Sequence, residues 1–223
     1  MSTHATTSPV NLIVIAKEPV ARRVKTRLCP PCTPEQAADL AAAALHDTLT
    51  AVAHTPAPRR VVVLDGNAGS WLPSGFDVVP QCGGGLDERL AHAFSAVGGP
   101  ALLVGMDTPQ VTPALLDEAS RALMRRPEGS VLGLSVDGGW WAVGLRRADP
   151  LAFLGVPMST PETGARQRAR LCARGSIPSL LSELRDVDTY ADARIVAGDL
   201  PGSRFATTFA RVATELHDAV DAA

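Results

Sequence analysis

The sequence is poor in aromatic residues, in positive charge and in long apolar runs, and each shortage excludes a class of protein. Only 4% of its 223 residues are aromatic, and the formal net charge is −2. The strongly basic surface that is typical of nucleic-acid-binding proteins is therefore missing. No apolar run approaches the ~18 residues of a membrane span, and the N-terminal residues lack the pattern of a signal peptide. We expect a cytoplasmic protein with no membrane span and no nucleic-acid partner.

Cysteine is also scarce, and several nucleotide and hydrolase motifs are absent. The four cysteines are compatible with a compartment in which thiols stay reduced. Cys29 and Cys32 form a CxxC motif, but no second ligand pair for a structural zinc accompanies it, so we interpret "CPPC" as a stiff loop. GxxxxGK[ST], GxGxxG and GxSxG do not occur. Their absence argues against a P-loop nucleotidase, a dinucleotide oxidoreductase and an α/β-hydrolase.

Short apolar runs alternate with amphipathic helical patterns along the chain. We expect a disordered tail over residues 1–9 and one domain over residues 10–223. The apolar runs are mostly continuous, which is typical of strands buried on both faces. The predicted strands are 10–16, 59–65, 76–81, 101–105, 130–135 and 140–145, and the predicted helices are 33–54, 86–97, 112–126, 160–175 and 203–221. This pattern predicts an α/β fold, a mostly parallel central sheet flanked by helices.

Basic side chains are concentrated directly after the first predicted strand. In "IAKEPVARRVKTRL" five cations follow the apolar run within eleven residues: Lys17, Arg22, Arg23, Lys25 and Arg27. Ligands of open α/β sheets bind at the carboxyl ends of the strands, and the point charge of lysine and the planar fork of arginine both suit phosphate. The stretch indicates a polyphosphate site, with a solvated basic loop as the alternative.

Acidic residues follow other strands. Asp107 comes after the buried strand 101–105, where a carboxylate is well placed to bind Mg²⁺ or Mn²⁺. "DTP" is equally typical of a turn. Asp186 and Asp188 are two residues apart, so in an extended segment both would face one side. Asp188 could instead be the N-cap of a helix that begins near Thr189.

Two glycine-containing stretches complete the candidate site. In "SVDGGWW", Asp137 precedes Gly138 and Gly139, which permit close approach of a ligand, and Trp140 supplies a flat apolar wall. A plain Asp-Gly hairpin with buried tryptophans is the alternative. In "QCGGGLDERL" a loop containing Gly84 and Gly85 leads into a helix, and its backbone N–H groups could face an anion.

The ordered set of motifs resembles one known family. "AKEPVARRVKTRL", "QCGGGLDERLAHAF", "VGMDTP", "VDGGWWAVGL", "STPETGARQRARL" and "DVDTYAD" occur in the order seen in the DUF2064 family of bacterial proteins, over about residues 10–200. That family is usually described as glycosyltransferases of the GT-A fold. It is similar to the nucleotidyltransferases that build molybdenum guanine dinucleotide and coenzyme F420. The resemblance implies a Rossmann-like GT-A sheet that binds a nucleotide over its first half.

The resemblance also implies roles for individual residues. Lys17, Lys25 and Arg27 would contact the phosphates of the donor. Asp107 would match the metal-binding acid of the fold, with Asp186 and Asp188 as the second metal ligands. Asp137 and Gly138, before Trp140, would shape the acceptor side. Arg22 stands where the family usually has glycine, and "DGGWW" replaces the usual "DGGYY".

The sequence therefore predicts a transferase dependent on Mg²⁺ or Mn²⁺ that uses an activated nucleotide. A nucleotide-sugar glycosyltransferase acting on a small-molecule acceptor is the first hypothesis, with Asp137 as the base and Lys25 stabilising the leaving group. A nucleotidylyltransferase that couples an NTP to a phosphorylated acceptor is the second. A nucleotide-binding module without turnover, favoured by Arg22, is the third. The donor, the acceptor and the oligomeric state stay open.

Overall fold

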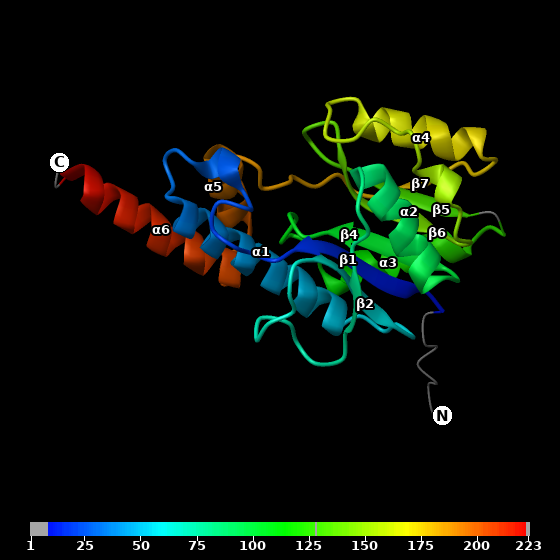
Figure 1. Cartoon of the computed structure of the whole chain (residues 1–223), viewed down its shortest axis with the longest axis horizontal. Coiled ribbons are helices and arrows are strands. Elements are labelled where there is room, and N and C mark those ends of the chain that lie inside the picture. Colours follow the sequence, from blue (N-terminus) through cyan, green and yellow to red (C-terminus); the bar gives the residue numbers. More distant parts are fainter. Residues whose placement is uncertain (1–8, 128, 222–223) are drawn as a thin grey trace.

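The computed structural model describes residues 9–127 and 129–221, and in this part of the chain seven strands form one sheet (Figure 1). The strands are β1 (Asn11–Lys17), β2 (Arg60–Asp65), β3 (Asp77–Pro80), β4 (Ala101–Gly105), β5 (Ser130–Leu134), β6 (Trp140–Leu145) and β7 (Ser179–Leu180). The helices are η1 (Thr26–Leu28), α1 (Pro34–Ala53), α2 (Leu86–Val97), α3 (Pro113–Met124), η2 (Pro150–Ala152), α4 (Thr163–Ala173), α5 (Tyr190–Asp199) and α6 (Arg204–Asp221). The predicted tail, residues 1–9, lies outside the described residues except for Pro9.

The sheet is mostly parallel, as predicted. Its strand order is β3-β2-β1-β4-β6-β5-β7. β1 pairs in parallel with β2 and β4, and β2 pairs in parallel with β3. β6 runs antiparallel to both β4 and β5. The short turn at Asp137–Gly139 forces this reversal, because a tight connection can join only antiparallel neighbours. Gly138 has a φ of 88°, which favours glycine there.

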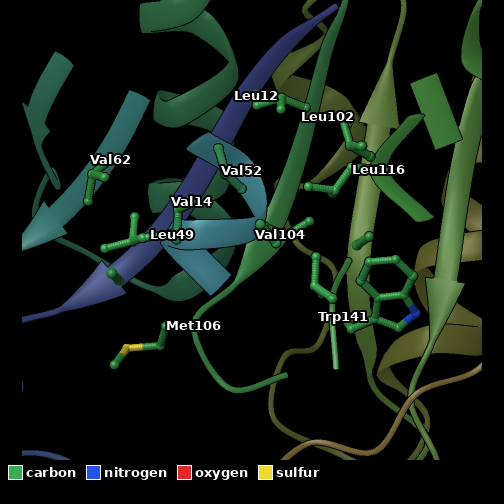
Figure 2. Close-up of a cluster of buried hydrophobic side chains, with 14 of the residues drawn as sticks. Leu12, Val14, Leu49, Val52, Val62, Leu102, Val104, Met106, Leu116 and Trp141 are labelled. Atoms are coloured by element: carbon green, nitrogen blue, oxygen red, sulfur yellow. The ribbon is translucent and has the colours of Figure 1, made fainter. Parts of the chain in front are cut away.

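Helices bury both faces of the sheet. Leu12 and Val14 of β1 face α1 and α3, whereas Ile13 between them faces α2. Figure 2 shows the first of these layers, in which Leu49 of α1 and Leu116 of α3 pack against the strands. With side chains buried on both faces, the strands need apolar residues at consecutive positions. The continuous runs in the sequence follow from this requirement.

The C-terminal helices add a second layer over α1. α5 and α6 pack beside α1 at the end of the molecule opposite α4 and β7 (Figure 1). α1 is rich in alanine, and its small side chains allow burial both against the sheet and against Phe205 of α6. Within residues 9–127 and 129–221, no helix is long and apolar enough to cross a membrane.

One predicted helix start is wrong, and the alternative that Asp188 is an N-cap is excluded. α5 begins at Tyr190 with Thr189 as its N-cap, so Asp188 is not the cap. Thr189 is paired with Asp192 in a capping box, which satisfies the first turn without Asp188. α4 begins at Thr163 rather than near Thr160, because the hydroxyl of Thr163 accepts a hydrogen bond from the backbone N–H of Thr160 (3.0 Å). The "TPE" segment is therefore a turn before the helix.

Candidate functional site

A cavity of about 530 Å³ lies at the carboxyl ends of β1 and β4. We call it the strand-end cavity. The end of β1, the residues after β4 and the β5–β6 turn form much of its wall, and residues 158–161 close it from the α4 side. Asp186 and Asp188 reach it from the extended segment before α5. Segments far apart in the sequence thus meet where parallel sheets commonly bind ligands.

Carboxylates are crowded in this cavity. Asp107, Asp137, Asp186 and Asp188 all line it. Burial, and then the nearby charges of Asp107 and Asp137, raise the pKa of Asp186 from 3.8 to about 7. The charge of Lys25, and then the hydrogen bond that the hydroxyl of Ser135 donates to Asp186 Oδ1 (3.2 Å), lower this pKa but only partly offset the rise. The cluster favours a positive ligand, because a cation would relieve the repulsion.

Lys25 supplies one such charge from within the chain. Its Nζ lies 2.9 Å from Asp107 Oδ1 and 3.0 Å from Asp188 Oδ1. The side chain is only 8% exposed. Burial disfavours the ammonium, but the two carboxylates outweigh it and raise the pKa of Lys25. Arg27 Nη1 lies 3.3 Å from the other oxygen of Asp188, so that carboxylate is shared by two cations.

The acids fit a single divalent cation better than a closed metal cage. No group of three or more His, Cys, Asp or Glu residues with the geometry of a metal centre occurs in residues 9–127 and 129–221. Asp188 is engaged by Lys25 and Arg27, whereas Asp186 has no cationic partner among the hydrogen bonds and ion pairs of the described chain. One or two carboxylates completed by substrate phosphates are the usual ligands of Mg²⁺. Asp107 and Asp186 are the carboxylates that could hold such a cation, provided that Lys25, which lies 2.9 Å from Asp107 Oδ1, gives up that contact.

The other predicted site residues fall inside and outside the cavity. Lys17, Arg27, Gly139 and Trp140 line it. Trp140 places its indole there, and its Nε1 is buried without a partner among the described residues. Gly138 does not line the cavity; a side chain at this position would collide with the backbone oxygen of Pro161. It holds the β5–β6 turn against the segment before α4.

Gly84 and Gly85 are not part of the cavity lining, and the backbone explains why. The N–H of Gly85 donates to Glu88 Oε2 (2.7 Å), closing the first turn of α2 with a carboxylate. The carbonyl of Gly84 accepts a hydrogen bond from Nε of Arg89 (3.1 Å). The N–H of Gly85 is therefore already used within the protein. The carboxylate of Glu88 also places negative charge at the start of α2, which disfavours an anion there.

Arg22 is exposed and does not line the cavity, and its backbone conformation suits the glycine that the family resemblance implies at this position. Its φ is 68°, in the left-handed region that costs a residue with a Cβ about 1–2 kcal/mol.

We expect Arg22→Gly to stabilise the fold by roughly 0.5–1 kcal/mol after the entropy of glycine is subtracted, a rise of about 1–4 °C in Tm. Calorimetry checks this. Arg22→Ala keeps the Cβ and should show no gain, and an equal gain would assign the effect to charge instead.

The acid cluster predicts a pH-dependent stability. With the pKa of Asp186 raised from 3.8 to about 7, the folded protein holds a proton that the unfolded chain releases. Stability is therefore lost as pH rises between about 4 and 7, and the loss is complete above pH 7. We expect Asp186→Asn, measured without divalent cations, to be ~1–3 kcal/mol more stable than the parent at pH 8 and nearly equal at pH 4. Urea unfolding measures this. A difference that does not change with pH would contradict it.

Sequence reasoning missed several residues of the cavity. Gln81 lines it from the β3–α2 connection and Arg89 from α2, and Met158 and Thr160 line it from the segment before α4. Gln81 carries a recognisable signal, because it is a polar residue directly after a strand whose carboxyl end faces the site. The segment before α4 carries none, since its position depends on how α4 packs over the sheet.

Comparison with known proteins shows the family and the fold of the chain. Residues 37–160 match the DUF2064 family, described as uncharacterized proteins conserved in bacteria, and the chain belongs to that family. A search of curated protein sequences gives no significant match. The fold is that of nucleotide-diphospho-sugar transferases and nucleotidyltransferases, which confirms the GT-A prediction.

Three solved structures illustrate the likeness. A protein of Desulfovibrio desulfuricans G20, provisionally described as a nucleotide-diphospho-sugar transferase, is 23% identical with a TM-score of 0.80, covering 96% of this chain and 95% of its own. The 2-C-methyl-D-erythritol 4-phosphate cytidylyltransferase of Thermus thermophilus is 16% identical with a TM-score of 0.53, covering 84% and 97%. CMP:2-keto-3-deoxy-manno-octonic acid synthetase, solved with CTP, is 12% identical with a TM-score of 0.55, covering 86% and 100%.

Proposed function

We propose that this protein is a transferase that uses an activated nucleotide and a divalent cation, and that its first candidate reaction is glycosyl transfer from a nucleotide sugar. The observation that carries the proposal is the strand-end cavity, which Asp107, Asp186 and Asp188 line, with the buried ammonium of Lys25 directly behind the lining, 2.9 Å from Asp107 and 3.0 Å from Asp188. Carboxylates that can hold a cation and an ammonium group that attracts phosphate, both fixed at the carboxyl ends of the strands, suit a diphosphate bound through a metal ion.

The phosphate side of the cavity is built from cations of the first loop. Lys17 and Arg27 line the cavity, and Arg27 is 72% exposed, so its guanidinium can turn to a phosphate. Mg²⁺ or Mn²⁺ held by Asp107 and Asp186 would neutralise the diphosphate. Lys25 would need to leave Asp107 and Asp188 before it could touch a phosphate directly. It already stabilises negative charge there electrostatically.

The acceptor side lies at the β5–β6 turn. Asp137 Oδ1 accepts a hydrogen bond from the N–H of Gly139 (2.9 Å), which orients the carboxylate beside Trp140. In the proposed reaction an acceptor hydroxyl forms a bond to the anomeric carbon as the bond to the diphosphate breaks. Asp137 takes the hydroxyl proton, and the nucleoside diphosphate leaves with the electron pair. The indole of Trp140 gives a sugar ring an apolar surface.

Nucleotidylyl transfer is the second candidate, and the number of cations favours it. Lys17, Lys25 and Arg27 together suit a triphosphate better than a diphosphate. The likeness to a cytidylyltransferase and to a synthetase solved with CTP supports the same reading. An acceptor phosphate would then attack the α-phosphorus, and pyrophosphate would leave.

A ligand screen followed by product analysis separates these reactions. Nucleotide sugars and NTPs are added with and without Mn²⁺, and the rise in Tm is recorded. A ligand at ~100 times its Kd stabilises by about 2.7 kcal/mol, or roughly 5–10 °C for this chain length. Mn²⁺-dependent shifts with nucleotide sugars, and release of a nucleoside diphosphate, support glycosyl transfer. Release of pyrophosphate from an NTP supports nucleotidylyl transfer. Shifts without turnover would leave a binding module, and no shift would contradict the nucleotide site.

A further inference from the structure

Gln81 is fixed across the edge of three strands. It follows β3, and its backbone N–H donates to the carbonyl of Leu64 in β2 (2.8 Å). Its side-chain Nε2 donates to the carbonyl of Ala16 in β1 (2.8 Å) and to that of Val63 in β2 (3.1 Å). The amide group is therefore held at the carboxyl ends of the strands by two side-chain bonds and one backbone bond.

This arrangement leaves one polar atom of Gln81 for a ligand. Both neighbours of Nε2 are carbonyl oxygens, so only the N–H side of the amide can face them, and both of its protons are used. Oε1 accepts no hydrogen bond in the described chain, and Gln81 lines the strand-end cavity. The site thus contains an oriented acceptor with no donor of its own.

The surroundings of Gln81 differ from those of the phosphate side. Ile15, Leu86 and Leu90 give the same cavity an apolar part, and Arg89 of α2 is a cation that also lines it. An amide oxygen repels a phosphate, but it accepts a hydrogen bond from a neutral N–H group, and low polarity strengthens that bond. A planar heterocycle with an N–H at its edge combines both properties.

We propose that Gln81 reads the nucleobase of the donor through Oε1. This inference rests on the proposed nucleotide site and adds its specificity. Bases of equal ring size differ in the hydrogen-bonding groups of their pairing edge. Uracil has a ring N–H donor where cytosine has a ring nitrogen that accepts, and guanine differs from adenine in the same way. A single fixed acceptor therefore discriminates within one of these pairs, because the wrong base would place an acceptor against Oε1.

Binding of four nucleoside diphosphates and inorganic pyrophosphate tests the proposal, with the Kd of each measured by calorimetry in Mn²⁺. We expect the parent protein to distinguish UDP from CDP, or GDP from ADP, by at least about tenfold. Gln81→Leu should reduce that ratio below about threefold and leave pyrophosphate binding within about twofold. Gln81→Lys keeps N–H donors for the Ala16 and Val63 carbonyls but removes the acceptor. It should therefore also lose the discrimination between the paired nucleotides, and it is the variant to use if Gln81→Leu does not fold.

The outcomes separate this inference from the proposed function. If Gln81 had only a structural role, its replacement would weaken the binding of all four nucleotides equally. An unchanged ratio of the nucleotide Kd values in a folded variant therefore overturns the proposal that Gln81 reads the base. Equal affinities of the parent protein for the four nucleotides overturn it as well, while nucleotide binding itself stands. A parent protein that binds neither nucleotides nor pyrophosphate contradicts the proposed function, and the inference with it.

Discussion

Lys25→Met is expected to change the affinities for anion and cation in opposite directions. In the proposed complex Lys25 leaves Asp107 and Asp188 for a phosphate; losing that charge-assisted contact costs about 1.5–3 kcal/mol, so a nucleoside diphosphate should bind roughly 10–100-fold more weakly. Mn²⁺ alone should bind about tenfold more tightly, since the ammonium 2.9 Å from Asp107 and 3.0 Å from Asp188 no longer competes for their oxygens. Calorimetric titrations with each ligand measure both effects, and Mn²⁺ should raise the Tm more in the variant.

Two further variants serve as controls for Lys25. Arg23 is an exposed cation of the same loop, paired at 3.6 Å with Asp65 rather than with the acids of the cavity. Arg23→Met removes the same charge and should change both affinities less than about threefold. Lys25→Arg keeps the charge and should retain most of the nucleotide affinity. Weaker binding of both ligands by Lys25→Met would instead show that the lysine only supports the loop.

Asp107→Asn is expected to abolish metal-dependent turnover under either proposed reaction. The change keeps the size of the side chain but removes the negative charge that would hold the cation at the end of β4. Loss of one electrostatic contact to a developing charge costs about 10²–10³-fold in kcat. Initial rates in Mn²⁺ measure the loss, with circular dichroism to confirm folding.

The matched control for this change is Asp117→Asn on α3, which removes a carboxylate from an exposed pair with Arg121. It should leave kcat within about twofold. Turnover by Asp107→Asn at the parent rate would show that the cation, if one is used, is held elsewhere.

The sequence was sufficient to predict six of the seven strands and most of the helices; the two-residue strand β7 has no apolar run of its own and was missed. Strands buried on both faces need consecutive apolar residues, and the run at 101–105 coincides with β4. The helix predicted over 86–97 coincides with α2 for a similar reason, because its apolar positions recur with the helical period. The packing of α5 and α6 over α1 could not be predicted, since no local pattern shows that the second face of an alanine-rich helix is buried.

The sequence predicted where the candidate site lies in the fold, but it did not predict which side chains contact one another there. Asp107 and Asp186 line the cavity because both follow elements that end at one edge of the sheet. The burial of Lys25 between two carboxylates depends on the left-handed backbone at φ 49°, which places its side chain inward and which sequence spacing does not encode. Gln81 was passed over because its role depends on carbonyls of β1 and β2 that are distant in sequence.

Anomalous diffraction from crystals grown with Mn²⁺ and a nucleoside diphosphate tests the central claim most directly. We predict one manganese peak in the strand-end cavity between Asp107 and Asp186, with the diphosphate bound to it and extending toward Arg27. The base should lie beside Gln81. Manganese or nucleotide bound at another surface, with Lys25 still joined to Asp107 and Asp188, would contradict the proposed site.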